Sequence, residues 1–155
     1  MNPGGAPRGS IHWQSKKMTD QTDPYEYRLP YAIQPPDTIQ ADVLKILDYI
    51  YGQRRDAEIT IRHPEFTSVC PMTGLPDMGT ITIVYVPDKS IVELKSLKYY
   101  LLQYRNVGIF YENTVNRILD DLAGALEPKQ MRITGEFTAR GGITARVEAV
   151  YGQEK

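Results

Sequence analysis

The residues most suited to chemistry lie in a predicted connection between two strands, over residues 66–78. The segment is rich in Pro, Gly and Thr, and it carries Cys70, the only cysteine, and Asp77. A cysteine thiolate is a nucleophile where its pKa is lowered, and an aspartate can carry protons to and from a reacting group. Loops between rigid strands often carry such groups. Structural explanations stay open, since a lone cysteine is often a small buried apolar residue and Pro-Asp is common in turns.

A second candidate is a basic helix predicted from residue 93 to about residue 105. Lys95, Lys98 and Arg105 recur at i, i+3 and i+10, which places them along one helix face. An apolar stripe runs beside this face and consists of Leu94, Leu97, Leu101 and Tyr104. Such a helix can pack on a sheet and face an anion, but an ordinary amphipathic helix with solvated lysines has the same pattern.

Three motifs occur in order between residues 65 and 122. They are C-P-M-T-G-L-P-D at residues 70–77, E-L-K-S-L-K-Y-Y at residues 93–100 and F-Y-E at residues 110–112. Together they resemble the signature of the NADPH-dependent nitrile reductases, which convert 7-cyano-7-deazaguanine to 7-aminomethyl-7-deazaguanine in queuosine biosynthesis. The resemblance therefore implies an enzyme of tRNA modification.

The resemblance also implies roles for individual residues. Cys70 would add to the nitrile carbon to form a thioimide, and Asp77 would move the protons. Glu112 would accept the N–H and amino groups of the substrate base, although a carboxylate at a helix start is also favoured by the helix dipole. Tyr111 departs from the family pattern, because many members have histidine there. A phenol can contact the substrate as a hydrogen-bond donor, but it does not become cationic near neutral pH.

The cofactor implied by the resemblance is NADPH. Its pyrophosphate and 2′-phosphate suit cations and a hydroxyl on one surface, which assigns Lys95, Ser96 and Lys98 to cofactor binding. Glu93 and Arg105 are expected to orient this face or to bridge to a neighbouring subunit. No G-x-G-x-x-G follows a predicted strand, so a Rossmann mode of binding is not supported.

Composition excludes several other classes. The chain has 155 residues, 41% of them hydrophobic and 24% charged, which fits one globular domain with a proper core. A net charge of −1 argues against broad attraction to nucleic acid or membranes. One cysteine and two histidines predict neither a disulfide nor a metal site. No apolar run approaches the ~20 residues that span a bilayer, and no apolar signal core is seen, so we expect a cytoplasmic protein.

The order of predicted elements is strand, strand, helix, helix, strand, strand. Residues 1–24 are predicted to be a poorly ordered arm, and residues 25–155 a single domain. We expect a short helix or turn over residues 38–51, strands over residues 58–62 and 80–86, and a second helix over residues 111–126. The apolar stripe of that helix consists of Val115, Ile118, Leu119 and Leu122. Two alternating runs around Gly141-Gly142 predict a hairpin.

This order predicts an α+β fold with a four-stranded antiparallel sheet and two helices on one face. It resembles the tunnelling fold, the ββααββ unit of the nitrile reductases, whose subunits join edge to edge into a barrel with active sites at the interfaces. The resemblance implies a homo-oligomer, a decamer of two pentamers, with no direct nucleic-acid partner. Open sheet edges give such assembly a physical motive.

Two other functions remain open. A relative could form the same thioimide and let ammonia attack it, as an amidinotransferase acting on a deazaguanine in tRNA, but the intact motif at residues 93–100 argues for the reductase. A non-catalytic binding module with the same fold is the third possibility. The pairing of Cys70 with Asp77 argues against it.

Overall fold

The computed structural model describes residues 29–152. The predicted arm over residues 1–24 lies outside the described residues. Within them, six strands, two α-helices and three 3-10 turns are arranged around one hydrophobic core. The strands are β1 (Ile46–Asp48), β2 (Ile59–Val69), β3 (Pro76–Val86), β4 (Ser90–Val92), β5 (Gln130–Arg140) and β6 (Ile143–Tyr151). The helices are α1 (Leu94–Leu102) and α2 (Tyr111–Leu126), and the 3-10 turns are η1 (Pro36–Thr38), η2 (Ala41–Val43) and η3 (Gln103–Asn106).

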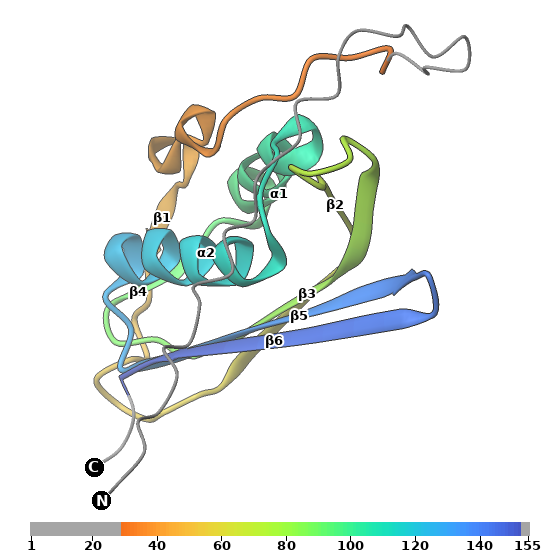
Figure 1. The fold of residues 1–155 in the computed structure, drawn as a ribbon. Coiled ribbons are helices and arrows are strands. Elements are labelled where there is room, and N and C mark those ends of the chain that lie inside the picture. Colours follow the sequence, from red (N-terminus) through yellow and green to blue (C-terminus); the bar gives the residue numbers. More distant parts are fainter. Residues whose placement is uncertain (1–28, 153–155) are drawn as a thin grey trace, which may run out of the picture.

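The main sheet has four antiparallel strands in the order β2-β3-β5-β6. Both helices lie on the same side of this sheet, with α2 running across β5 and β6 and α1 above the β2 end (Figure 1). The β5–β6 hairpin turns at Gly141 and Gly142, whose φ values of 57° and 81° are those that glycine adopts without steric cost. The predicted α+β architecture is confirmed.

The core forms between the inner face of the sheet and the two helices. Strand β3 contributes every second residue to this face, in the row Ile81, Ile83 and Tyr85. The predicted apolar stripe of α2 is confirmed, since all four of its members are buried. In α1 the buried face contains Leu97 and Leu101 as predicted. Leu94 is 61% exposed, however, and Tyr100 and Ser96 are buried in addition.

Two predicted connections are wrong in detail. The segment predicted as a short helix or turn over residues 38–51 contains the 3-10 turn η2 and then β1, which pairs with β4, a short strand that was not predicted. Pairing with β4 overrides the helical spacing there, and Leu47 and Ile50 are exposed, so no apolar helix face exists. The expected loop over residues 66–78 is also shorter, because β2 extends to Val69 and β3 begins at Pro76.

A β-bulge in β2 explains why the sequence places the end of this strand too early. His63 pairs with Ile81 but Phe66 pairs with Gly79, so two residues of β2 oppose the single residue Thr80. The bulge breaks the alternation of the sequence and turns Phe66 toward the core, where it is 1% exposed. The period of two that marked the first strand therefore stops there, although the strand continues.

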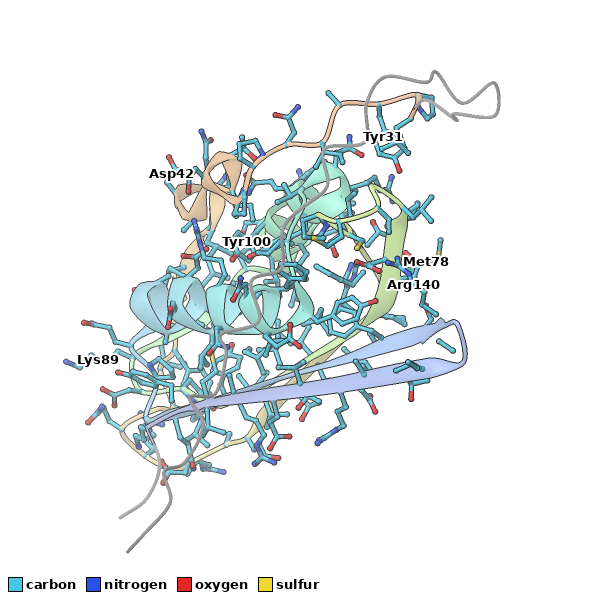
Figure 2. All side chains as sticks on the ribbon, in the orientation of Figure 1. Tyr31, Asp42, Met78, Lys89, Tyr100 and Arg140 are labelled. Carbon is cyan, nitrogen blue, oxygen red and sulfur yellow. The ribbon has the colours of Figure 1, made fainter. Side chains whose placement is uncertain are left out.

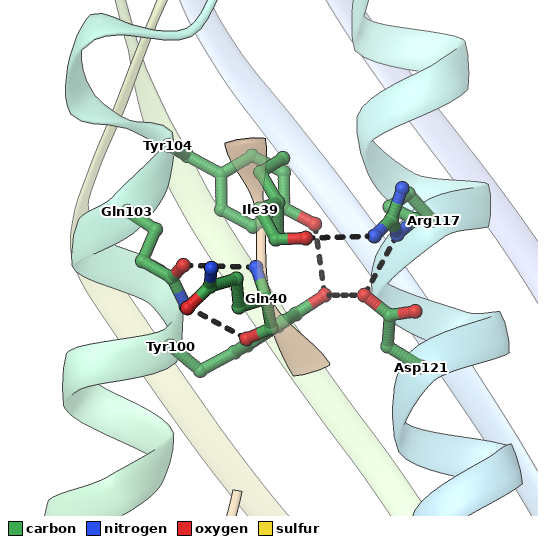
Figure 3. Close-up of polar contacts among 7 residues, drawn as sticks. All are labelled: Ile39, Gln40, Tyr100, Gln103, Tyr104, Arg117 and Asp121. Atoms are coloured by element: carbon green, nitrogen blue, oxygen red, sulfur yellow. Dashed lines mark hydrogen bonds and ion pairs between the residues drawn. The ribbon is translucent and has the colours of Figure 1, made fainter. Parts of the chain in front are cut away.

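A polar network joins the two helices beneath the segment that precedes β1 (Figure 3). Tyr100 Oη donates to Asp121 Oδ2 at 2.7 Å and lies 2.8 Å from Tyr104 Oη. Arg117 Nε donates to the same Asp121 oxygen at 2.8 Å, and Arg117 Nη2 donates to Ile39 O at 3.0 Å. Burial raises the pKa of both tyrosines, so both remain neutral donors. The network fixes α1, α2 and the chain around Ile39 relative to one another.

Asp121→Ala is expected to lower the free energy of unfolding by about 2 to 3 kcal/mol, because a buried tyrosine hydroxyl and a guanidinium lose their shared acceptor. Urea unfolding measures the change. Asp120→Ala is the matched control, since Asp120 is the exposed neighbour on the same helix, and it is expected to change stability by less than about 0.5 kcal/mol. Equal losses in the two variants would contradict the structural role of the network.

Candidate active site

A cleft of about 320 Å³ opens where β2 ends and β3, α2 and β6 begin. Six of its lining residues define what we call the Cys70 cleft: Cys70, Asp77, Phe110, Tyr111, Glu112 and Arg140. Four of them are predicted site residues from two separate motifs, and the fold brings them to one place. Its volume is in the range of small-molecule sites.

Cys70 follows directly after β2, at the start of a tight turn over residues 70–75. Cys70 N donates to Leu75 O at 2.9 Å, and Gly74 N donates to Cys70 O at 2.8 Å. Gly74 has φ of 72°, a conformation that favours glycine. The turn holds Cys70 half-buried, as a free thiol at the cleft.

The surroundings of Cys70 lower the pKa of its thiol. The largest cause is a hydrogen bond from the Thr73 side chain, and the backbone N–H groups of Thr73 and Met72 and the Arg140 guanidinium act in the same direction. Burial opposes them by disfavouring the thiolate. The surroundings therefore favour the thiolate form of Cys70, in contrast to an apolar pocket, which disfavours it.

Asp77 lies in the row of β3 residues that faces the core, one position from the strand start, and is 4% exposed. Tyr111 Oη donates to Asp77 Oδ1 at 2.8 Å, and Arg140 Nη2 forms an ion pair with the same oxygen. No described residue hydrogen-bonds the second oxygen, Oδ2. The carboxylate is thus held by two donors on one side, and it is not simply a turn residue.

Tyr111 begins α2 and stacks on Phe137 of β5, with ring centroids 3.8 Å apart and an interplanar angle of 11°. Burial raises its pKa to about 12, and the hydrogen bond to Asp77 acts in the same direction. The phenol is therefore neutral near physiological pH and donates a hydrogen bond to the carboxylate. Glu112, on the next position of α2, is exposed at the cleft and has no hydrogen-bond partner for its carboxylate among the described residues.

Two residues of the cleft were not assigned from the sequence. Arg140, the last residue of β5, reaches back to β3, where Nη2 donates to Pro76 O at 2.9 Å and pairs with Asp77 (Figure 2). Its position next to the Gly-Gly turn suggested only a hairpin. Phe110 is 48% exposed at the cleft as the N-cap of α2, and it presents an aromatic surface to a flat ligand. An exposed aromatic beside a motif carboxylate is the signal that could have identified it.

The predicted cofactor residues are divided among three places. Glu93, Lys95 and Ser96 line a second cleft of about 310 Å³ together with Lys45 and Tyr99, and these five define the Lys95 cleft. It shares no lining residue with the Cys70 cleft.

The other two basic residues lie outside the Lys95 cleft. Lys98 is exposed, with its Nζ 5.8 Å from the centre of the Tyr99 ring. Arg105 lines a third hollow of about 270 Å³, where its Nε donates to Thr67 Oγ1 at 3.5 Å. Lys95 and Lys98 are both exposed one turn apart on α1, whereas Arg105 in η3 lines a different hollow from Lys95.

Glu93 and Ser96 carry structural duties in the Lys95 cleft. Glu93 caps α1 by accepting from the backbone N–H of Lys95 and of Ser96, each at 2.7 Å, and these bonds lower its pKa. Ser96 is buried, donates to Glu93 O and accepts from Lys45 N. The capping carboxylate occupies the helix N-terminus, so phosphate groups are left with the exposed ammonium groups of Lys45 and Lys95. The charges fit NADPH, while the Ser96 hydroxyl is already engaged.

Residues 29–152 contain neither a metal-ion cluster nor a membrane-spanning helix. No group of three or more His, Cys, Asp or Glu side chains is placed to hold a metal ion. No helix in the same range has the length and apolar character needed to cross a membrane.

The four-stranded sheet and the two helices on its inner face define a tunnelling-fold protein, and its cleft joins a free cysteine to an aspartate. Comparison with known proteins identifies the family to which the chain belongs within this class. Residues 76–155 match the family described as QueF-like protein, and the chain belongs to that family.

Relatives and one solved structure agree with the assignment. An NADPH-dependent 7-cyano-7-deazaguanine reductase of Chlorobaculum tepidum is 58% identical over 114 residues, which are 74% of this chain and 97% of that protein. A reductase of the same name from Chloroherpeton thalassium is 64% identical over 101 residues, covering 65% and 87%. The crystal structure of the archaeosine synthase QueF-Like in the apo form superposes with a TM-score of 0.57 over 64% of this chain and 96% of that chain. At 21% identity it supports the fold alone.

Thr73→Val is expected to raise the pKa of Cys70, because it removes the hydrogen bond that lowers this pKa most. A lost hydrogen bond of about 1 kcal/mol corresponds to roughly 0.7 of a pKa unit. The pH dependence of alkylation by iodoacetamide measures the shift, and mass spectrometry reads Cys70 alone because the chain has one cysteine.

Thr73→Ser is the control for that experiment, since serine keeps the hydroxyl and is expected to keep the wild-type profile. An unchanged profile in Thr73→Val would show that the threonine does not activate the thiol.

Proposed function

We propose that this chain is an NADPH-dependent reductase that converts the nitrile of 7-cyano-7-deazaguanine to the amine of 7-aminomethyl-7-deazaguanine, a step of queuosine biosynthesis. The observation that carries the proposal is the Cys70 cleft, which joins a thiol of lowered pKa to a buried aspartate and to the Glu112 carboxylate, which has no partner among residues 29–152. Relatives of this name, more than half identical and covered over almost their whole length, support the same activity.

Cys70 acts first in the proposed mechanism. Its thiolate adds to the electrophilic nitrile carbon, a C–S bond forms, and one π bond of the nitrile becomes the lone pair of nitrogen. The nitrogen takes a proton through Asp77, whose Oδ2 has no protein partner among the described residues. The product is a thioimide, whose C=N bond accepts hydride where the triple bond does not.

Tyr111 and Arg140 keep Asp77 in place during these transfers. Both bind Oδ1, so the carboxylate cannot rotate without losing two partners. Tyr111 contributes a neutral hydrogen bond instead of the cationic imidazole that histidine would allow. Proton movement in this chain therefore runs through Asp77 alone.

Glu112 and Phe110 hold the substrate base. The exposed Glu112 carboxylate accepts two neighbouring N–H groups from a guanine-type edge. The Phe110 ring supplies a flat apolar surface beside it. Together they orient the nitrile toward Cys70.

Lys95, with Lys45 of the same cleft and Lys98 beside it, would hold the phosphates of NADPH. When bound, NADPH supplies the two hydrides that a nitrile needs to become an amine. Ser96 and Glu93 contribute by fixing the start of α1, and with it the position of Lys95.

The proposal also includes a homo-oligomer and a cytoplasmic location for the protein. The edge strands β2 and β6 have 11 and 9 residues, and exposed Ile143, Val150 and Tyr151 lie on β6. Long edges with apolar side chains favour pairing with further copies, which supports a homo-oligomer with sites at the interfaces. Catalysis by Cys70 requires a reduced thiol, which the cytoplasm maintains.

An amidinotransferase that forms the same thioimide is the second candidate function, because the Cys70 cleft would serve either chemistry. It needs ammonia instead of hydride. NADPH consumption separates the two.

Mixing the protein with NADPH and 7-cyano-7-deazaguanine is expected to bleach the nicotinamide absorbance band, with two cofactors consumed for each nitrile. Cys70→Ala is expected to abolish this signal, since no thioimide can form. A thioimide detected by mass spectrometry without loss of NADPH would instead support the amidinotransferase. If neither a covalent adduct nor NADPH oxidation is observed, only the binding module remains as a candidate.

Lys95→Ala is expected to raise the KM for NADPH about tenfold, the effect of losing one charged contact of roughly 1.4 kcal/mol, and to leave the KM for the nitrile unchanged. Steady-state kinetics with each reactant varied in turn give both values. Lys89→Ala is the control, because Lys89 is exposed in the turn before β4 and lines neither cleft (Figure 2). A similar rise in both variants would place the cofactor elsewhere.

A further inference from the structure

A β-bulge at the end of β5 decides where Arg140 points. Phe137 pairs with Ala145 and Arg140 with Ile143, so Thr138 and Ala139 together oppose the single residue Thr144. In a regular strand, residues 137 and 140 would face opposite sides of the sheet. The extra residue changes this parity and turns Arg140 to the face on which Phe137 stacks with Tyr111.

Arg140 has three neighbours on that face. Its Nη2 donates to Pro76 O at 2.9 Å and forms the ion pair with Asp77, and its side chain lines the same cleft as the thiol of Cys70 and helps to lower the pKa of that thiol. It therefore joins the end of β5 to the start of β3 and to the residue that follows β2. A planar guanidinium has several donors in fixed directions and can serve all three groups at once.

We propose that Arg140 is the positioning residue of the active site, holding the Cys70 sulfur and the Asp77 carboxylate at the separation that thiol addition to a nitrile needs. The inference rests on the proposed function, because it assigns Arg140 to the same thiol addition. Arg140 pairs with Asp77, lines the same cleft as Cys70 and need not touch the substrate. Its single positive charge therefore faces two groups that carry negative charge when the thiol is ionised.

The charged and titratable groups that face Cys70 come from three elements. Asp77 faces it from β3, Tyr111 and Glu112 from α2, and Arg140 from β5. Among residues 29–152, Arg140 is the one cation that lines the cleft. The two carboxylates disfavour a thiolate in their midst, so the thiolate depends on the hydrogen bonds of the 70–75 turn, that of Thr73 above all, and on this cation.

The test measures the thiol without substrate or cofactor. In Arg140→Gln the midpoint of the pH profile of Cys70 alkylation by iodoacetamide is expected to rise by about half a unit, less than in Thr73→Val, which makes alkylation below the midpoint about threefold slower. Arg140→Lys keeps the charge but cannot reach all three partners, and it is expected to shift the midpoint upward by less. Arg146→Gln, which removes an exposed arginine paired with Glu148 on β6, is the control with a wild-type profile.

Kinetics supply a second readout. In Arg140→Gln the kcat for NADPH oxidation is expected to fall about threefold at pH values below the thiol midpoint and to recover as pH rises past it, with the KM for the nitrile changed by less than about twofold. A purely structural defect would lower kcat equally at every pH.

An unshifted alkylation profile in folded Arg140→Gln overturns the inference. If that variant does not fold, Arg140→Lys decides, and an unshifted profile there overturns it equally. Because alkylation needs neither NADPH nor nitrile, a shifted profile in a protein that lacks reductase activity would support the positioning role and reject the proposed function.

Discussion

The site depends on one buried carboxylate oxygen. Asp77 Oδ1 accepts from Tyr111 and pairs with Arg140, so the start of α2 and the end of β5 are both tied to the start of β3. A carboxylate that is 4% exposed is costly without such partners, and with them it is fixed in one orientation. The stacking of Tyr111 on Phe137 and the turn that carries Cys70 complete this arrangement. The cleft is therefore largely formed before any ligand arrives.

Two β-bulges in an otherwise regular sheet help to form the site around Asp77. The bulge in β2 turns Phe66 into the core and brings the strand to its end at Val69, directly before Cys70. The bulge in β5 turns Arg140 to the same inner face. Between them, β3 runs without interruption and carries Asp77 in its core-facing row. Each extra residue re-aims the residues beyond it, which is a common use of bulges near functional sites.

The Lys95 cleft, which we assign to the cofactor, is organised by the capped start of α1. Glu93 caps α1 and Ser96 links the helix to the chain at Lys45, so the motif at residues 93–100 builds a rigid helix start as well as presenting lysines. The Lys95 cleft and the Cys70 cleft share no residue within one subunit. Joining subunits along the open edges of β2 and β6 is the simplest way for a hydride donor and a nitrile to meet. This gives the proposed oligomer a chemical reason in addition to the unpaired edges.

The sequence by itself determined the α+β order, the buried stripe of α2 and the hairpin at Gly141-Gly142, because periodicity and turn chemistry are local. Local motifs also identified Cys70, Asp77, Tyr111 and Glu112 as candidate site residues. It did not determine β1, β4 or the true ends of β2, since these depend on pairing with distant segments. Arg140 was missed for the same reason. Its role follows from a bulge that reverses the facing of the strand end and from contacts with residues more than 60 positions away, and only the tertiary structure brings those groups together.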